Sequence, residues 1–178
     1  MAMTVNIYPA ANGSYQQCAQ QYPASGSHYD KLSTNDGYET YVKSSRVGGT
    51  TFYETYRFNF PAGIYSNITL KMWVCCESGS YGHYSKSGAF VYSPAGSYAS
   101  GLTALACGPS NFALKSYSFS TNPITGAAWG VIDNTTEFGF KGWQCCNNES
   151  MLITQLYLTV TYEPLSSGGA QIIGLSDI

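Results

Sequence analysis

Apolar and polar residues alternate with a period of two along much of the chain, and this pattern is typical of β-strands with one buried face. The alternation is clearest in residues 52–60, 67–76 and 151–162. Successive side chains of a strand point to opposite faces of its sheet, so we expect one face of each run to enter the core. The core residues predicted on this basis are Phe58, Leu70, Met72, Val74, Leu156, Leu158 and Val160.

Turn signals separate the other strand candidates. Residues 3–7 form the first expected strand, which a turn at 12–13 should close. Residues 29–32 and 38–42 flank an Asn-Asp-Gly turn and are expected to pair as a hairpin. The best helix candidate, residues 127–133, is only one or two turns long. The remaining strand candidates are 89–92, 102–106, 112–119 and 135–140. Roughly eight to ten short strands at this spacing predict an all-β fold, an antiparallel β-sandwich of jelly-roll type.

The last residues of the chain differ in character from the rest. We expect a β-sandwich domain over residues 1–164 and a flexible C-terminal tail over 165–178, because a Ser-Ser-Gly-Gly sequence opens the tail. Apolar residues then follow, which a fully solvated tail would not need. One interpretation is a frayed terminus, and the other is an arm that packs on a neighbouring subunit. The arm residues would be Ile172, Ile173, Leu175 and Ile178.

Composition excludes several classes of partner. Charged residues make up 10% of the 178-residue chain, and its formal net charge is −2. With only eight Lys and Arg residues, the chain lacks the clustered basic footprint of a surface that binds nucleic acid. No run approaches the roughly 18 consecutive apolar residues of a membrane-spanning helix. We therefore expect neither nucleic acid nor membrane as a partner.

The N-terminal residues lack the basic segment and the apolar run of a secretory signal. The abundance of hydroxyl and amide side chains, in contrast, is common in proteins that work outside cells. A chain that leaves its cell by another route, such as a virus particle released by lysis, would combine the two features. The other interpretation is that a signal has been removed or replaced.

Two pairs of adjacent cysteines stand in similar contexts, Cys75-Cys76 and Cys145-Cys146. Adjacent side chains of a strand face opposite ways, so one thiol of each pair could join the core while the other faces out. Disulfides between the two pairs are one interpretation, and buried thiols are the other. The pairs lack the CxxC spacing of structural zinc sites, and the chain has only two histidines. We therefore expect no metal and no cofactor.

No arrangement of residues points to catalysis. The sequence has no GxSxG nucleophile motif, no phosphate-binding loop and no dinucleotide fingerprint. His28 lies beside Asp30 on one expected strand face, but a single contact of this kind is usually structural. Asp36 and Glu39 near a turn are a weak calcium signal. We therefore expect a protein that is not an enzyme.

Aromatic residues in Gly- and Ser-rich loops carry the remaining functional signal. An aromatic ring offers a large contact area at low entropic cost, and such rings suit sugar stacking or protein contact. The alternative is that these rings complete the core or cover sheet edges. The candidate contact residues for a ligand or partner are Tyr81, His83, Tyr84, Tyr98 and Trp129.

Three blocks of sequence together resemble a family of virion proteins. The first joins residues 28–32 to 37–42, the second joins 127–133 to 138–140, and the third is 153–162. They read HYDKL with GYETYV, AAWGVID with FGF, and ITQLYLTVTY. In this order they resemble single-domain β-sandwich structural proteins of tailed-bacteriophage virions.

The resemblance implies a non-enzymatic structural role in the virion, as a head-decoration, head-fibre or tail-attached protein. It implies other virion proteins as partners, assembly as a homo-oligomer and no catalytic residues. The adjacent cysteines and the 16 tyrosines depart from the family pattern. The alternative function is a carbohydrate-binding module or adhesin, whose aromatic loops would bind a glycan such as one on a host surface.

Overall fold

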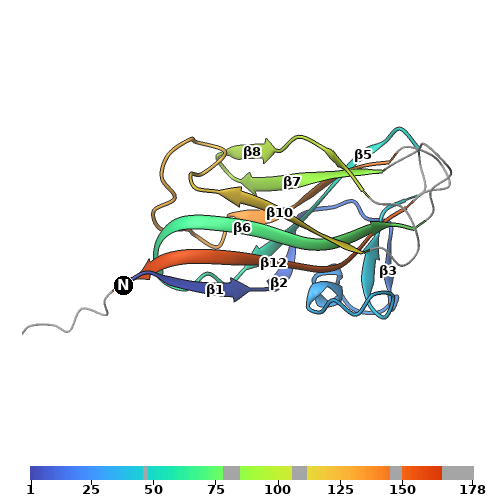
Figure 1. Cartoon of the computed structure of the whole chain (residues 1–178), viewed down its shortest axis with the longest axis horizontal. Coiled ribbons are helices and arrows are strands. Elements are labelled where there is room, and N and C mark those ends of the chain that lie inside the picture. Colours follow the sequence, from blue (N-terminus) through green and yellow to red (C-terminus); the bar gives the residue numbers. More distant parts are fainter. Residues whose placement is uncertain (46–47, 78–84, 106–111, 145–149, 166–178) are drawn as a thin grey trace, which may run out of the picture.

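Two antiparallel β-sheets pack face to face in the computed structural model of this protein (Figure 1). The structure describes residues 1–45, 48–77, 85–105, 112–144 and 150–165. The chain crosses repeatedly between the sheets, so that strands close in sequence often lie in opposite layers. The predicted all-β sandwich of jelly-roll type is therefore confirmed.

The longest pair of strands forms the centre of the first sheet, and two strands that are well separated in sequence form the centre of the second. The first sheet contains, in spatial order, β10 (Ala113–Phe119), β6 (Gly63–Cys76), β12 (Met151–Pro164), β4 (Tyr41–Lys43) and β3 (Gln20–Tyr22), with β1 (Met3–Ile7) also paired to β12. The second contains β2 (Pro9–Gln16), β5 (Thr51–Phe58), β11 (Glu137–Trp143), β7 (Lys86–Ser93) and β8 (Gly96–Ala99), with β9 (Thr103–Ala104) also paired to β7.

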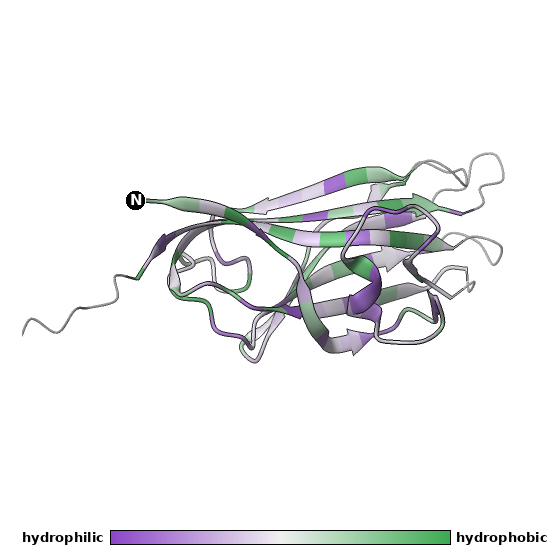
Figure 2. Ribbon diagram, turned by 90° about the horizontal axis from the view of Figure 1, so that it is seen from below, coloured by the Kyte–Doolittle hydropathy of each residue, from purple (hydrophilic) through white to green (hydrophobic). Residues whose placement is uncertain are grey.

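Alternating side chains of both sheets fill the space between them, and the ribbon coloured by hydropathy shows this alternation along the strands (Figure 2). All seven core residues predicted from the sequence are at most 1% exposed, so that prediction is confirmed. Aromatic rings from the second sheet, including those of Phe58 and Phe138, meet edge-to-face inside this core.

Three local predictions are wrong. The turn expected at 12–13 lies within β2, which continues to Gln16. The helix expected at 127–133 is absent from that described segment. Residues 29–32 are not a strand, because a 3₁₀ helix, η1 (His28–Leu32), takes their place. The amide of Ser27 donates to Asp30 Oδ2 at 2.9 Å, and this contact closes the first turn of η1.

Helix η1 and strand β3 lie at the end of the sandwich opposite the N-terminus (Figure 1). The loop from η1 to β4 is held by the carboxylate of Asp36, which accepts hydrogen bonds from the Thr40 amide at 3.0 Å and from the Thr34 hydroxyl at 3.0 Å. Within the described residues, no helix is long and apolar enough to cross a membrane.

Candidate functional site

A cavity of about 540 Å³ lies beside the short edge strand β3. Its walls come from β3, from the first residue of β4, from the connections that flank β3, and from the start of η1. The lining contains no carboxylate and no lysine or arginine. The lining residues are Ala19, Gln20, Gln21, Tyr22, Ala24, His28 and Tyr41.

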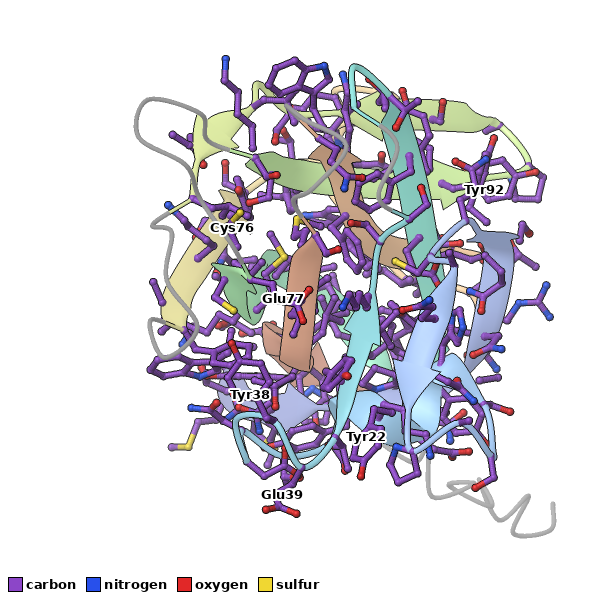
Figure 3. All side chains as sticks on the ribbon, turned by 90° about the vertical axis from the view of Figure 1, so that its right-hand side faces the viewer. Tyr22, Tyr38, Glu39, Cys76, Glu77 and Tyr92 are labelled. Carbon is purple, nitrogen blue, oxygen red and sulfur yellow. The ribbon has the colours of Figure 1, made fainter. Side chains whose placement is uncertain are left out.

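Three tyrosines form an aromatic platform, defined here as Tyr22, Tyr41 and Tyr38, and the first two of them line the cavity. Tyr22 and Tyr41 are directly paired across β3 and β4, and their rings stack with centroids 5.6 Å apart and planes 17° apart. Tyr38 meets Tyr41 edge-on at 6.3 Å. Tyr22 is 52% exposed and Tyr38 is 39% exposed. The end-on view shows both near one edge of the molecule, away from Tyr92 (Figure 3).

Glutamine side chains supply the polar part of the cavity wall. The Gln21 amide nitrogen donates to the carbonyls of Ala24 at 3.1 Å and Gly26 at 2.7 Å, which fixes the orientation of this side chain. Its Oε1 is a buried acceptor that has no hydrogen-bond partner among the described residues. Gln20 adds a second amide to the same wall. Rings and amides together suit a ligand that carries both C–H faces and hydroxyl groups.

His28 stands on the cavity wall in contact with a buried carboxylate. Its Nδ1 lies 2.6 Å from Oε1 of Glu54, a residue of β5 that is fully buried. The second carboxylate oxygen of Glu54 accepts the Cys18 amide at 2.8 Å. His28 therefore pairs with a residue 26 positions away, and not with the neighbouring Asp30, as its place in the sequence suggested.

Tyr38 and Tyr41 keep their protons at ordinary pH. Burial, followed by the nearby Cys75 and Glu77, raises the pKa of Tyr38 to about 12. Burial and the charge of Glu77 also raise the pKa of Tyr41. The Glu77 charge is partly balanced by Lys43, whose Nζ lies 2.6 Å from Oε2 of Glu77. The hydroxyls of Tyr38 and Tyr41 therefore stay protonated, and that of Tyr38 is engaged by the Cys75 thiol.

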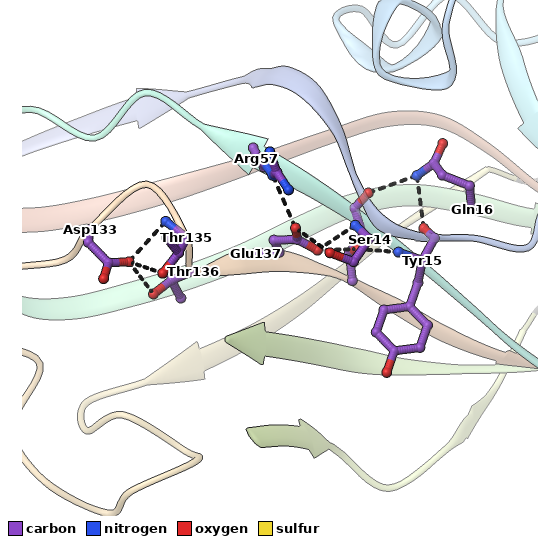
Figure 4. A network of polar contacts seen from close by, with 9 residues as sticks. Ser14, Tyr15, Gln16, Arg57, Asp133, Thr135, Thr136 and Glu137 are labelled. Atoms are coloured by element: carbon purple, nitrogen blue, oxygen red, sulfur yellow. Dashed lines mark hydrogen bonds and ion pairs between the residues drawn. The ribbon is translucent and has the colours of Figure 1, made fainter. Parts of the chain in front are cut away.

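A second polar cluster surrounds Glu137 at the start of β11 (Figure 4). Its buried carboxylate accepts the Ser14 amide at 2.7 Å, the Thr55 hydroxyl at 2.8 Å and Nε of Arg57 at 3.1 Å. Burial raises the pKa of Glu137, but these hydrogen bonds outweigh burial and lower it overall. The cavity above this cluster is smaller, about 240 Å³. Because its carboxylate is fully engaged by the protein, the cluster mainly fastens β2 to β5 and β11.

Two of the predicted contact residues lie in the described structure, and both pack on the core. Trp129 is buried, and its indole nitrogen donates to the Phe119 carbonyl at 2.8 Å. It also lines a cavity of about 290 Å³. The Tyr98 ring packs edge-on against Phe119 at 6.0 Å. That either residue contacts a ligand stays a prediction.

Several predicted residues lie outside the ranges that the structure describes, so their roles stay predictions. These residues are Tyr81, His83 and Tyr84 of the contact set, Cys145 and Cys146 of the cysteine pairs, and Ile172, Ile173, Leu175 and Ile178 of the arm.

One thiol of the 75/76 pair joins the core and the other faces away from it, as expected, but both are fully buried. Cys76 belongs to the core between the sheets. Cys75 points the other way, where Tyr38 hydrogen-bonds its thiol. Burial raises the pKa of Cys75 to about 12.

The calcium signal at Asp36 and Glu39 has a different explanation. Asp36 uses its oxygens on threonine side chains and one amide of its own loop. Within the described part of the chain, no group of three or more His, Cys, Asp or Glu residues gathers around a point that could hold a metal ion.

Comparison with known proteins gives no family for this chain. No family model matches it, and no curated protein matches its sequence. Among solved structures it is similar to the xylan-binding module CBM15, with 9% identity, a TM-score of 0.48, and coverage of 90% of this chain and 96% of that one.

Two further solved structures show similar levels of likeness. A carbohydrate-binding module from Cellvibrio mixtus lichenase 5A, solved with cellotriose, has 13% identity and a TM-score of 0.42, and the match covers 90% of this chain and 98% of that one. An arabinose-bound GH51 α-L-arabinofuranosidase has 11% identity and a TM-score of 0.46 over 85% of this chain. The chain spans only 27% of that enzyme. Likeness at this level does not identify a ligand.

Proposed function

We propose that this protein binds carbohydrate, and that the cavity beside β3 is the binding site. The observation that carries the proposal is the stacked pair of Tyr22 and Tyr41 on the cavity wall, with Tyr22 half exposed to solvent. Surface rings of this kind are large apolar faces held in one orientation, and they bind the C–H faces of sugar rings with little loss of side-chain entropy.

The rest of the wall supports the same class of ligand. A cavity of about 540 Å³ lies within the range of small-molecule sites, which is roughly 300–1,000 Å³. Amides of Gln20 and Gln21 and the imidazole of His28 offer directional hydrogen bonds beside the rings. Sugar hydroxyls both donate and accept, so they can satisfy such a mixed set of groups.

The edge position of the site also favours an extended ligand. Strand β3 is the last strand of its sheet and has only three residues, so the cavity opens at the sheet edge rather than inside the sandwich. A polysaccharide chain could therefore enter and leave the site from either side, with one or two sugar units held at the platform.

Binding to a panel of soluble polysaccharides, measured by affinity electrophoresis and then by calorimetry, tests this function. We expect Tyr22→Ala and Tyr41→Ala to weaken binding about tenfold or more, which corresponds to about 1.4 kcal/mol. Tyr22→Phe keeps the ring and should retain most of the affinity.

The matched control is Tyr8→Ala. Tyr8 is also well exposed, and it packs on Tyr157 with centroids 5.7 Å apart, but it does not line the cavity. This variant should bind like the unchanged protein. Equal losses for Tyr8→Ala and Tyr22→Ala would contradict the assigned site, and the absence of binding to every polysaccharide would contradict the function.

The virion role that the family resemblance implies stays a prediction. A protein exposed on a particle could still bind a glycan, so the two roles are compatible. Mass spectrometry that finds this chain at high stoichiometry in purified particles would establish the location.

A further inference from the structure

The aromatic platform continues beyond the cavity as a longer row of rings. Phe112, the residue directly before β10, meets Tyr38 edge-on with ring centroids 5.5 Å apart. Four rings therefore follow one another in contact, and we define them as the aromatic row. Its members, in spatial order, are Tyr22, Tyr41, Tyr38 and Phe112. The first two line the cavity, and the last two lie outside its lining.

The first two rings of the row lie on the outer face of the first sheet. Val42 is fully buried in the core between the sheets, so its neighbour Tyr41 points to the opposite face of β4. Tyr22 is the direct partner of Tyr41 across β3 and β4, and directly opposite side chains share one face of a sheet. The stacked pair therefore faces away from the core.

The other two rings lie on the same face, further along the sheet. Cys75 stands between two core residues of β6 and points outward, and Tyr38 hydrogen-bonds its thiol. Ala113 pairs with Val74, so Phe112 stands at the register of Cys75. Because the sheet has the order β10-β6-β12-β4-β3, the aromatic row crosses it from one edge to the other.

Packing of the core does not account for this row. None of its four rings belongs to the core cluster or to the partly buried side chains that pack against that cluster. Tyr22 and Tyr38 are its most exposed rings, and the end-on view shows both near one edge of the molecule (Figure 3). Apolar surface that the core does not require is typical of a contact surface. Since the row is continuous with the proposed sugar site, we assign it to the same ligand.

The two most exposed rings of the row face in different directions. The planes of Tyr22 and Tyr41 are only 17° apart, whereas the plane of Tyr38 is inclined to that of Tyr41 by 82°. The planes of Tyr22 and Tyr38 are therefore steeply inclined to each other. A sugar stacks with its ring parallel to an aromatic face, so two sugars held on these two rings must be turned relative to each other.

We propose that the ligand is a polysaccharide chain that crosses the strands of the first sheet along the aromatic row, and whose successive sugar faces are turned relative to one another. This inference rests on the proposed carbohydrate function and names the ligand class and the extent of the same site. A flat ribbon, such as β-1,4-glucan or β-1,4-mannan, keeps the faces of its units parallel and can stack on only one of the two exposed rings. Helical chains, such as β-1,3-glucan, α-1,4-glucan and β-1,4-xylan, turn the face from unit to unit.

The experiment measures the affinity for di-, tetra- and hexasaccharides of these five chains by calorimetry. We expect at least one helical hexasaccharide to bind about tenfold or more tighter than either ribbon hexasaccharide. Its affinity should also rise about tenfold from the disaccharide to the hexasaccharide, because only the longer chain reaches from Tyr22 to the rings outside the cavity.

Variants of the outer two rings test the extent of the site. Tyr38→Ala should weaken binding of the preferred hexasaccharide about tenfold and leave the disaccharide unchanged, and Tyr38→Phe should restore the affinity because it keeps the ring. Phe112→Ala should cause a smaller loss, about threefold, for the hexasaccharide alone. Leu114→Ala is the matched control, because Leu114 is an exposed apolar residue of β10 that lies outside the row. It should bind every chain like the unchanged protein.

The outcomes separate this inference from the proposed function. Equal or tighter binding of the ribbon chains, or binding confined to other members of the polysaccharide panel, would overturn the inference and leave carbohydrate binding intact. Equal losses for the disaccharide and the hexasaccharide in Tyr38→Ala would limit the site to the cavity. Sedimentation that shows a dimer, lost in Tyr38→Ala and Phe112→Ala without a change in sugar affinity, would assign the outer rings to a protein interface instead. Absence of binding to every chain and to the whole panel would contradict the proposed function itself.

Discussion

The hydroxyl of Thr154 donates to Oδ1 of Asp36 across 3.0 Å, and this contact joins a β-bulge of β12 to the loop before β4. Thr154 is the extra residue of the bulge, between Ile153 and Gln155, and it is fully buried. The bulge turns its side chain toward a loop that no ladder hydrogen bond would otherwise hold. Because that loop carries Tyr38, the position of one platform ring depends on this contact.

Replacing Thr154 by Val should therefore destabilise the protein. The change keeps the shape of the side chain but leaves Asp36 without one of its buried donors, at a cost of about 1–2 kcal/mol. Urea unfolding followed by tyrosine and tryptophan fluorescence measures the loss. Thr4→Val is the control, since that hydroxyl pairs with Thr161 on an exposed face. Equal effects of the two substitutions would show that the bulge contact contributes nothing special.

Acid should destabilise the protein through Asp36 and Glu137. Burial acts to raise the pKa of both carboxyls, but hydrogen bonds outweigh it, so their pKa values are lowered from 3.8 and 4.5. A lowered pKa in the folded state gives stability that is fully present above the ordinary value and is lost as the pH falls through the folded value. We expect the urea midpoint to fall below about pH 4.

Two variants assign that acid transition. Asp36→Asn and Glu137→Gln should each be less stable at pH 7, and each should lose part of the dependence on pH below about 4, because the substituted side chain cannot be protonated there. A midpoint curve that keeps its full slope in both variants would attribute the acid transition to other carboxyls.

Gly139 is predicted to tolerate no side chain. It pairs with Thr55 in the centre of the second sheet, and a Cβ built on it would overlap the backbone carbonyl of Glu54. Gly139→Ala must therefore push β11 away from β5, and we expect a loss of about 3 kcal/mol or more, or no folded protein. Gly101→Ala is the control, because nothing lies within 4 Å of its added carbon. A stable Gly139→Ala protein would mean that the two strands are further apart than described.

The strands could be predicted where alternation is long and uninterrupted. Residues 67–76 and 151–162 pair along their length in the structure, and their apolar faces meet the second sheet. The wrong predictions concern short polar segments, whose residues are compatible with either a turn or a strand. The Asn-Gly at 12–13 resembles a turn, yet both residues lie in β2. Glycine is required at position 13 because the strand passes so close to Thr55 and Glu137 that a side chain there would overlap them. Only the tertiary packing distinguishes these outcomes.

The candidate site was harder to predict, because distant pairings create it. Tyr22 and Tyr41 come together through a three-residue edge strand that is too short to show a period. One signal was available in the sequence. Glu54 stands on the apolar face of the run at 52–60, and a carboxylate in that position requires a buried partner. The identity of that partner, His28, follows only from the fold.

Cys75 should resist alkylation in the folded protein. Burial raises its pKa to about 12, against an ordinary value of 9.0, so the reactive thiolate at pH 8 is about a thousandfold scarcer than for an exposed cysteine. Iodoacetamide at pH 8, followed by peptide mapping, should label Cys75 only after denaturation. Tyr38→Ala removes the ring whose hydroxyl bonds the thiol and should increase labelling, while Tyr8→Ala should not. Rapid labelling of Cys75 in the unchanged protein, or no response to Tyr38→Ala, would show that the aromatic platform does not cover this thiol.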